Sequence, residues 1–351
     1  MKILLTGHLG YIGSILAWRL LERDHDVVGL DSDLFADCSF ADGVPELHSI
    51  GGDIRDFVSD SAAVERLRGF DAVIHLAGLS NDPLGDYRPG LTRAINATAS
   101  IALARLARAA GVGRFVYASS CSNYGASNDE FVAEDGRLCP VTPYAESKVE
   151  SEAAIIALAD DGFSPTFLRA STAYGVSPRL RFDLVVNNLT AWACATGEVH
   201  LKSDGSPWRP IVHVEDIALA YIAAVEAPRA DVHGEVFNVG QTTENYQIRE
   251  IAELVRQIVP GAKIGFAAEA SPDLRNYRVD CDYIARRLHG FKPQWTCRRG
   301  IEQLFDAFDA RGLSVEDFEG PRFKRIAHIQ QRIAEGTLHE DLYPIQRRIA
   351  V

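Results

Sequence analysis

The first half of the chain alternates short apolar runs with longer amphipathic stretches. The apolar runs lack the polar alternation of half-exposed strands, and they predict buried parallel strands at residues 2–6, 26–30, 72–75, 115–118 and 166–169. Amphipathic stretches at 12–22, 62–67 and 98–110 predict helices between these strands. Strands that alternate with helices indicate a doubly wound parallel sheet covered on both faces. The predicted fold class is therefore α/β.

Beyond Gly175 the pattern predicts a smaller lobe that is interleaved with the end of the large domain. A helix preceded by a basic loop is expected at 179–197, and further helices are expected at 214–226 and 248–259, with strands at 199–202, 235–239 and 262–268. We assign residues 1–175 plus 206–240 to the large domain, and residues 176–205 plus 241–351 to the smaller lobe and a C-terminal tail. The tail is expected to be helical and charged, and to carry no chemistry.

Composition narrows the class of protein. The chain has 351 residues, of which 47% are hydrophobic and 24% charged, as in a soluble globular protein with a large core. A net charge of -12 disfavours a nucleic-acid partner because an acidic surface repels phosphate backbones. No pair of cysteines has metal-ligand spacing, no apolar run reaches the roughly 20 residues of a membrane span, and no leader precedes the first strand. We expect a cytoplasmic protein without a metal or a membrane partner.

A glycine-rich turn follows the first strand. The segment from Thr6 to Gly13 reads TGHLGYIG and opens the first predicted helix. Glycines there permit a tight turn and let the backbone approach a pyrophosphate, while the helix N-terminus supplies free N–H groups. Asp31 ends the second strand, where an acid binds ribose hydroxyls and repels a 2′-phosphate. An acid there is otherwise a solvated loop residue, but motif and position together predict a Rossmann domain that binds NAD.

Tyr144 and Lys148 lie four residues apart and share one face of a predicted helix. A tyrosine with its usual pKa of about 10 is a poor base, but a nearby ammonium and a positive nicotinamide ring favour the phenolate. Ser120 ends a predicted strand, where it can hold a substrate oxygen against Tyr144. The alternatives are an exposed aromatic–cation pair for Tyr144 and Lys148, and turn chemistry for Ser119 and Ser122.

With these motifs in place, the chain resembles the extended short-chain dehydrogenases/reductases, and among them the nucleotide-sugar epimerase/dehydratase family typified by UDP-galactose 4-epimerase. The resemblance runs from residue 1 to about residue 295. It implies catalytic roles for Ser120, Tyr144 and Lys148. It implies NAD contacts at Gly7, Leu9, Gly10, Tyr11, Ile12, Gly13, Asp31, Asp53, Ile54, Leu76, Ala77, Gly78, Asn96, Ser119, Tyr144, Lys148 and Ala170. It implies contacts with a nucleotide-diphosphate sugar at Ser80, Ser120, Ser122, Tyr144, Thr172, Asn187, Asn188, Leu201, Arg209, Arg275 and Arg278.

The chain departs from the family pattern at two places. Dehydratases of the family carry an Asp-Glu pair directly after the catalytic hydroxyl residue, whereas this chain has Cys121 and Ser122. Neither is a competent acid for eliminating water, so a 4,6-dehydratase is disfavoured. The family's R-x-G-D segment near the diphosphate is replaced by residues 270–278, and we expect Arg275 or Arg278 to substitute for the usual arginine. Two further basic residues, Arg179 and Arg181, are candidates for phosphate binding and equally for surface ion pairs.

The resemblance leads to an NAD-dependent nucleotide-sugar epimerase, acting at C4 through a transient keto-sugar, as the preferred hypothesis. A 4-keto-sugar reductase or sugar dehydrogenase uses the same three catalytic residues and is the alternative. Asp31 favours the epimerase, since the reductases often prefer NADP. A non-catalytic dinucleotide-binding protein is the third hypothesis, although such proteins usually lose the tyrosine or lysine. The resemblance also implies a homodimer. His75 and His213 are expected to be hydrogen-bonded core residues.

Overall fold

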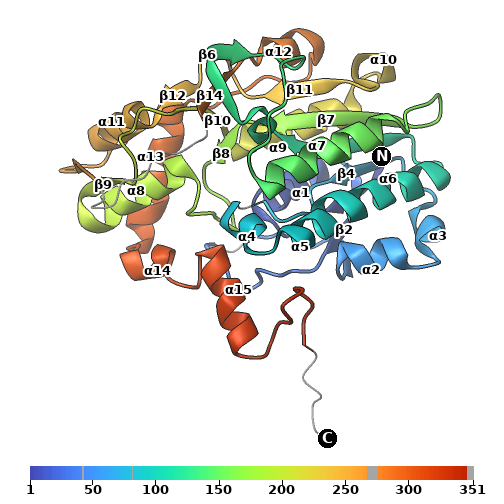
Figure 1. Cartoon of the computed structure of the whole chain (residues 1–351), viewed down its shortest axis with the longest axis horizontal. Coiled ribbons are helices and arrows are strands. Elements are labelled where there is room, and N and C mark those ends of the chain that lie inside the picture. Colours follow the sequence, from blue (N-terminus) through green and yellow to red (C-terminus); the bar gives the residue numbers. More distant parts are fainter. Residues whose placement is uncertain (42, 81, 267–275, 346–351) are drawn as a thin grey trace, which may run out of the picture.

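The computed structural model describes residues 1–41, 43–80, 82–266 and 276–345. Its large domain is built on a seven-stranded parallel sheet with the strand order β11-β7-β5-β4-β1-β2-β3 (Figure 1). The strands are β1 (Lys2–Thr6), β2 (Asp26–Asp31), β3 (His48–Gly51), β4 (Ala72–His75), β5 (Arg114–Ser120), β7 (Ser164–Ala170) and β11 (Val236–Val239). This sheet confirms the predicted doubly wound α/β class.

Helices cover both faces of the sheet, which explains why its central strands are apolar throughout. Ile3, Leu4 and Leu5 of β1 are fully buried because they contact helices on opposite sides. One face carries α1 (Tyr11–Leu21), α9 (Val214–Glu226), α10 (Arg229–Val232) and α12 (Asp282–Arg287). The other carries α2 (Ile54–Ser59), α3 (Ala63–Leu67), α4 (Asp82–Tyr87), α5 (Pro89–Arg93), a π-helical turn (Ala94–Thr98), α6 (Ala99–Ala109) and α7 (Pro143–Ile156).

The smaller lobe packs beside the carboxyl ends of the central strands (Figure 1). Three short sheets lie here, with the orders β12-β10-β8, β13-β9 and β14-β6, and they include β6, β8 and β10 from the ranges that were assigned to the large domain. The β14-β6 pair was not predicted, because its two short strands lie far apart in the sequence. The elements are β6 (Ala126–Val132), β8 (Thr172–Tyr174), α8 (Val185–Thr196), β9 (Glu198–Leu201), β10 (Trp208–His213), β12 (Asn245–Gln247), α11 (Ile248–Ile258), β13 (Lys263–Phe266), β14 (Asn276–Val279) and α13 (Cys297–Arg311).

The C-terminal tail packs against both parts of the molecule, which was not predicted. The tail contains α14 (Val315–Glu319) and α15 (Arg325–Ala334), and it returns to the large domain. Ile329 of α15 and, after it, Leu338 and Leu342 are buried in the core of that domain. The assignment of residues 241–351 to the smaller lobe and tail stays a prediction, but the tail contacts both parts of the molecule (Figure 1).

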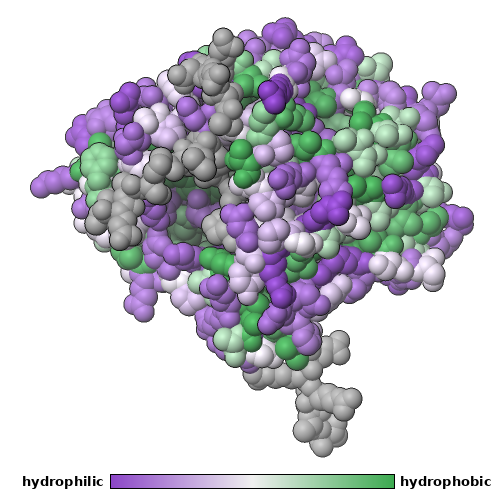
Figure 2. All heavy atoms as spheres, viewed as in Figure 1, coloured by the Kyte–Doolittle hydropathy of each residue, from purple (hydrophilic) through white to green (hydrophobic). Residues whose placement is uncertain are grey.

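On the face shown in Figure 2, polar side chains predominate and apolar ones gather over α6 and α7. Across the described ranges, no helix has both the length and the apolar character needed to cross a membrane.

Candidate active site

A cavity of about 1030 Å³ opens at the carboxyl ends of the central strands. The segments that follow β1, β2, β4, β5 and β7 line one side of it, and residues of α8, β9 and the C-terminal tail line the other. Parallel sheets bind their ligands at this edge, where successive strand ends converge. Most of the residues that the sequence predicted for the NAD and substrate sites line this cavity.

The glycine turn, residues 7–13, forms the dinucleotide cradle, and side chains at Gly7 and Gly13 would collide with the neighbouring backbone. Gly7 has a φ of +76°, and a Cβ there would lie 2.8 Å from the Ala77 nitrogen. A Cβ on Gly13 would lie 2.0 Å from the Gly7 oxygen, so the turn and α1 can pack together only with glycine. Gly10 is the N-cap of α1 and no side chain caps this helix, which leaves its first-turn N–H groups for a ligand. Together with Leu9, Tyr11 and Ile12, which also line the cavity, these residues fit a dinucleotide pyrophosphate.

Asp31 connects the glycine turn to the loop that follows β2. Its carboxylate accepts hydrogen bonds from the Leu9 nitrogen at 2.9 Å and from the Asp33 nitrogen at 2.9 Å, and it lines the cavity. Asp53 and Ile54 line the cavity as well, but Asp53 is already the N-cap of α2 and forms an ion pair with Arg55 at 2.8 Å. Of the two acids, Asp53 is the one that already pairs with an arginine of the helix it caps, so we keep Asp31 as the expected partner of the ribose hydroxyls, and contact of Asp53 with NAD stays a prediction.

The end of β4 provides the next wall, through Leu76, Ala77 and Gly78. Asn96, in the π-helical turn, does not line the cavity. Its side chain accepts a hydrogen bond from the Leu79 nitrogen at 2.8 Å and donates one to the Leu79 oxygen at 2.9 Å. Asn96 therefore positions the main chain of this wall, which corrects the expectation that it contacts NAD.

Tyr144 and Lys148 enter the cavity from the first turns of α7. The helix begins at Pro143 with Thr142 as its N-cap, and the two side chains lie one turn apart. The Lys148 ammonium lies 5.6 Å from the centre of the Tyr144 ring and 4.8 Å from that of Tyr117. Burial lowers the pKa of Lys148 to about 8, against the opposing charge of Glu152. This ammonium is well placed to stabilise the Tyr144 phenolate.

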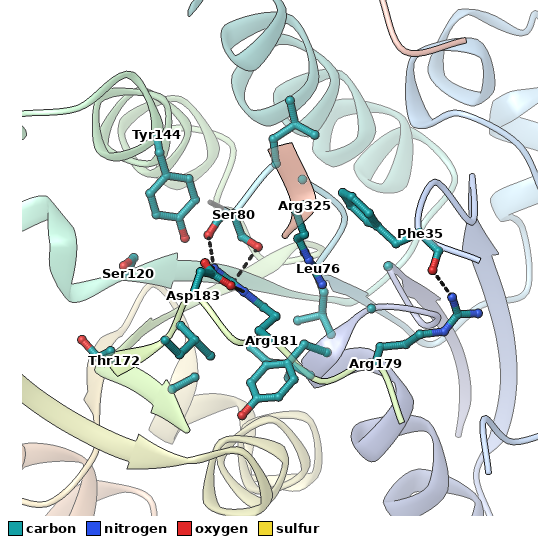
Figure 3. A pocket seen from close by; sticks show the side chains of 18 of the residues that line it. Phe35, Leu76, Ser80, Ser120, Tyr144, Thr172, Arg179, Arg181, Asp183 and Arg325 are labelled. Atoms are coloured by element: carbon teal, nitrogen blue, oxygen red, sulfur yellow. Dashed lines mark hydrogen bonds and ion pairs between the residues drawn. The ribbon is translucent and has the colours of Figure 1, made fainter. Parts of the chain in front are cut away.

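Ser120 ends β5 on the same side of the cavity as Tyr144 and Thr172 (Figure 3). Its hydroxyl oxygen accepts hydrogen bonds from the Ser122 nitrogen at 3.1 Å and the Ser122 hydroxyl at 2.9 Å, within the short helical turn Cys121–Tyr124. The proton of Ser120 thus remains available for a ligand oxygen. Cys121 turns the other way, and its fully buried thiol donates to the Arg169 oxygen at 3.1 Å.

A buried ion pair lies beneath Ser120 and Lys148. Arg169 of β7 and Glu152 of α7 approach to 2.6 Å, with side-chain exposures of 5% and 9%. Ser119, which lines the cavity, donates a hydrogen bond to Glu152, and the Asn123 amide donates to the same carboxylate at 3.2 Å. This network joins β5, α7 and β7 at the point where they present Ser120 and Lys148.

The residues expected to contact substrate divide into three groups. Those that line the cavity, besides Ser120 and Tyr144, are Ser80, Ser122, Thr172, Asn188, Leu201 and Arg209. Ala170, from the residues expected to contact NAD, also lines it. Asn187 instead accepts from the Gly175 nitrogen and donates to the Arg181 oxygen. Arg278 lies away from the cavity, with its guanidinium over the rings of Trp208 and Phe131, so it cannot replace the family arginine there. Arg275 lies outside the described residues.

Several lining residues were missed or left undecided at the sequence level. The predicted helix at 179–197 begins only at Val185, so residues 179–184 form a loop along the cavity. In this loop Arg181 donates to the Ser80 hydroxyl and oxygen and forms an ion pair with Asp183 at 2.6 Å (Figure 3). Arg179 instead pairs with Asp33 at 3.1 Å. The alternation of charged and apolar residues in RLRFD, with an acid two residues after the second arginine, was the available signal for this ion-paired loop.

Two histidines have the structural roles that were predicted. His75 lies between Thr6 and Ser100, at 2.6 and 2.7 Å, and burial lowers its pKa to about 3. His213 stacks on Trp295 and contacts Gln303, and burial lowers its pKa to about 4. Both are therefore neutral core residues. Within the described residues, no group of three or more acidic, histidine or cysteine side chains is placed to hold a metal ion.

Comparison with known proteins agrees with this geometry. The model of the NAD dependent epimerase/dehydratase family matches residues 3–240. A UDP-glucose 4-epimerase of Lactobacillus helveticus is 31% identical over 74% of this chain and 82% of its own. The structure of MoeE5 in complex with UDP-glucuronic acid and NAD is 26% identical, covers 89% of this chain and 100% of its own, and superposes with a TM-score of 0.75. A dTDP-glucose 4,6-dehydratase of Streptomyces venezuelae, solved with NAD, is 25% identical, with a TM-score of 0.74 over 90% of this chain and 100% of its own. The chain belongs to the NAD-dependent epimerase/dehydratase family, and NAD is its cofactor.

Proposed function

We propose that this enzyme is a nucleotide-sugar epimerase that inverts C4 of the sugar through a transient keto-sugar. The observation that carries the proposal is the convergence of Tyr144, Lys148 and Ser120 on the cavity that also contains the dinucleotide cradle. The cavity has room beyond that cradle, along Thr172, Leu201 and Arg209, for a second nucleotide. The relative from Lactobacillus helveticus, a UDP-glucose 4-epimerase, supports this assignment.

The side chains divide the proton chemistry among them. NAD, when bound, supplies a hydride acceptor in the first half of the reaction and a donor in the second. The Tyr144 phenolate takes the proton of the C4 hydroxyl, and the Lys148 ammonium lowers the cost of that phenolate. Ser120 donates a hydrogen bond to the same oxygen and holds it beside Tyr144. When the keto-sugar turns over in the cavity, Tyr144 returns the proton to the oxygen of the inverted alcohol.

The position after Ser120 argues against a dehydratase. Elimination of water needs an acid beside the leaving hydroxyl, whereas Cys121 is fully buried and points away from the cavity. Burial raises the pKa of its thiol to about 12, which makes it a poor proton donor at neutral pH. The next residue, Ser122, reaches the cavity but is not an acid in this pH range.

A substrate panel without added cofactor tests the proposal. Purified protein is incubated with UDP-glucose, UDP-galactose, UDP-glucuronic acid and dTDP-glucose, and the products are identified by NMR. We expect one pair of C4 epimers to interconvert without net NADH, and a deuterium label at C4 to be retained because the bound cofactor returns it. A product that forms only with added NADPH points to a reductase, and a product that has lost water points to a dehydratase. Either result contradicts the proposal.

We also propose a homodimer formed through α6 and α7, the face on which apolar side chains gather (Figure 2). Ile156 at the end of α7 is 39% exposed, and such an interface would cover it. Sedimentation equilibrium is expected to give twice the mass of the chain, and Ile156→Asp to give a folded species of half that mass. A wild-type protein that is monomeric at micromolar concentration contradicts this arrangement.

A further inference from the structure

The C-terminal strap, residues 313–345, crosses the mouth of the cavity and ties the two parts of the molecule together. Its start is fixed in the smaller lobe, where Phe318 and Phe323 pack on Phe182 with ring centres 5.7 and 5.1 Å apart. Its end is fixed in the large domain through Leu338 and Leu342. The family match ends at residue 240, so this strap belongs to the part of the chain that the family model leaves out.

The strap also holds the loop that follows Asp31. The Arg322 guanidinium donates to the Ser39 oxygen at 3.2 Å, and the Arg332 guanidinium donates to the Leu34 oxygen at 2.7 Å. The Arg325 guanidinium lies 4.4 Å from the centre of the Phe35 ring. Loop and strap thus form one continuous wall over the ribose side of the dinucleotide cradle, and Phe35 and Arg325 both line the cavity.

Arg325 introduces a buried charge that forms no ion pair with any of the described residues. Figure 3 shows it inside the cavity, near Arg181. Across residues 1–41, 43–80, 82–266 and 276–345, no carboxylate lies within ion-pair distance of Arg325, whereas Arg181 is paired with Asp183. Burial lowers the pKa of Arg325 to about 10 and the charge of Arg181 adds to the effect, against the opposing charges of Asp183 and Asp31. A cation in such surroundings is unfavourable until an anion reaches it.

We propose that Arg325 binds the diphosphate of NAD from the side opposite the glycine turn, and that the strap thereby retains the cofactor. Phe35, in the loop after Asp31, packs on Arg325, and Figure 3 shows the guanidinium on the Phe35 and Leu76 side of the cavity, away from Thr172. The guanidinium therefore faces the dinucleotide half of the cavity and not the sugar half. An arginine suits this task because its planar fork donates two parallel hydrogen bonds to phosphate oxygens. The inference uses NAD as the cofactor and is independent of which sugar is bound.

If the proposal is right, the Arg325 charge destabilises the protein without NAD and stabilises the complex with NAD. In the full-length protein stripped of NAD, Arg325→Met removes a buried charge but keeps the apolar stem, so the melting temperature is expected to stay the same or rise. The affinity for NAD, measured by calorimetry, is expected to fall about 10- to 100-fold, as for a lost charge-assisted hydrogen bond. The stabilisation by added NAD falls accordingly. A residue with a merely structural role would instead lower the melting temperature of the stripped protein.

Three comparisons make the result decisive. Arg286→Gln removes an exposed charge from α12, outside the cavity, and is expected to leave both quantities unchanged. Adenosine, which lacks phosphate, is expected to bind the wild type and Arg325→Met equally. UDP carries the diphosphate of the proposed sugar-nucleotide substrate, and its affinity is expected to be the same for the wild type and Arg325→Met. If Arg325→Met binds NAD within twofold of the wild type, or loses UDP affinity in place of NAD affinity, the proposal is overturned.

Discussion

Replacing Tyr144 by phenylalanine is expected to lower kcat by about 10²- to 10⁴-fold, the usual contribution of a positioned acid–base group. The substitution removes only the hydroxyl, so Lys148 keeps an aromatic ring beneath its ammonium and α7 keeps its N-cap at Thr142. The dinucleotide cradle is built from other segments, the glycine turn and Asp31, and NAD affinity should change less than threefold. A large loss in kcat with intact cofactor binding is therefore the signature of a proton-transfer role.

The control for this variant is Tyr283→Phe, which removes a phenol that lies outside the cavity and donates to Glu235 at 2.8 Å. Its kcat should equal that of the wild type. Steady-state rates are measured on whichever sugar nucleotide the wild type converts, and bound NAD is measured in parallel. A Tyr144→Phe enzyme that converts its substrate as fast as the wild type would show that another group moves the proton.

The parts of the site that could be predicted from the sequence are those with a short-range physical requirement. Gly7 and Gly13 are needed because any side chain would strike the neighbouring backbone, and the requirement is visible as a local motif. Tyr144 and Lys148 share a helix face by their spacing alone. Each of these residues depends only on its own strand–turn–helix segment. The strands and helices that were predicted in the large domain lie close to those observed, but β3, α2, α4, α5 and α10 were not predicted.

The parts that could not be predicted depend on where distant segments meet. Arg325 enters the cavity only because the strap crosses from the smaller lobe to the large domain, and no local pattern around residue 325 encodes that path. Asn96 shows the complementary limit. A motif placed it correctly beside the cofactor wall, but whether its amide meets the ligand or the main chain of Leu79 depends on interatomic distances. A motif therefore predicts which part of the site a residue lies near, but not which atoms its side chain contacts.

Breaking the buried ion pair beneath the site is expected to have the largest effect on stability. Arg169→Met leaves the Glu152 carboxylate buried without its cation, and Glu152→Gln leaves the Arg169 guanidinium without its anion. Either change is expected to lower the free energy of unfolding by about 3–5 kcal/mol, the cost of stranding a buried charge. Because each single variant strands a charge and the double variant strands none, the double variant should lose less than the sum of the two. Urea unfolding of the four proteins measures this coupling.

The same pair should influence catalysis through Lys148. The Glu152 carboxylate opposes the burial that lowers the pKa of Lys148 to about 8. Without that carboxylate the pKa falls further, so Lys148 loses its proton at a lower pH. Because the ammonium form stabilises the Tyr144 phenolate, the alkaline decline of kcat/KM in Glu152→Gln should begin at a lower pH than in the wild type.

Glu150→Gln is the matched control, since it makes the same substitution on the same helix. Glu150 pairs with Arg93 at 2.7 Å, but these side chains are 37% and 67% exposed. An exposed pair contributes about 0–1 kcal/mol, so the Glu150→Gln enzyme should keep both its stability and its pH profile. If Glu152→Gln destabilised the protein but left the alkaline limb in place, the network would be structural only. The charge of Lys148 would then be set by burial alone, and Glu152 would have no part in activating Tyr144.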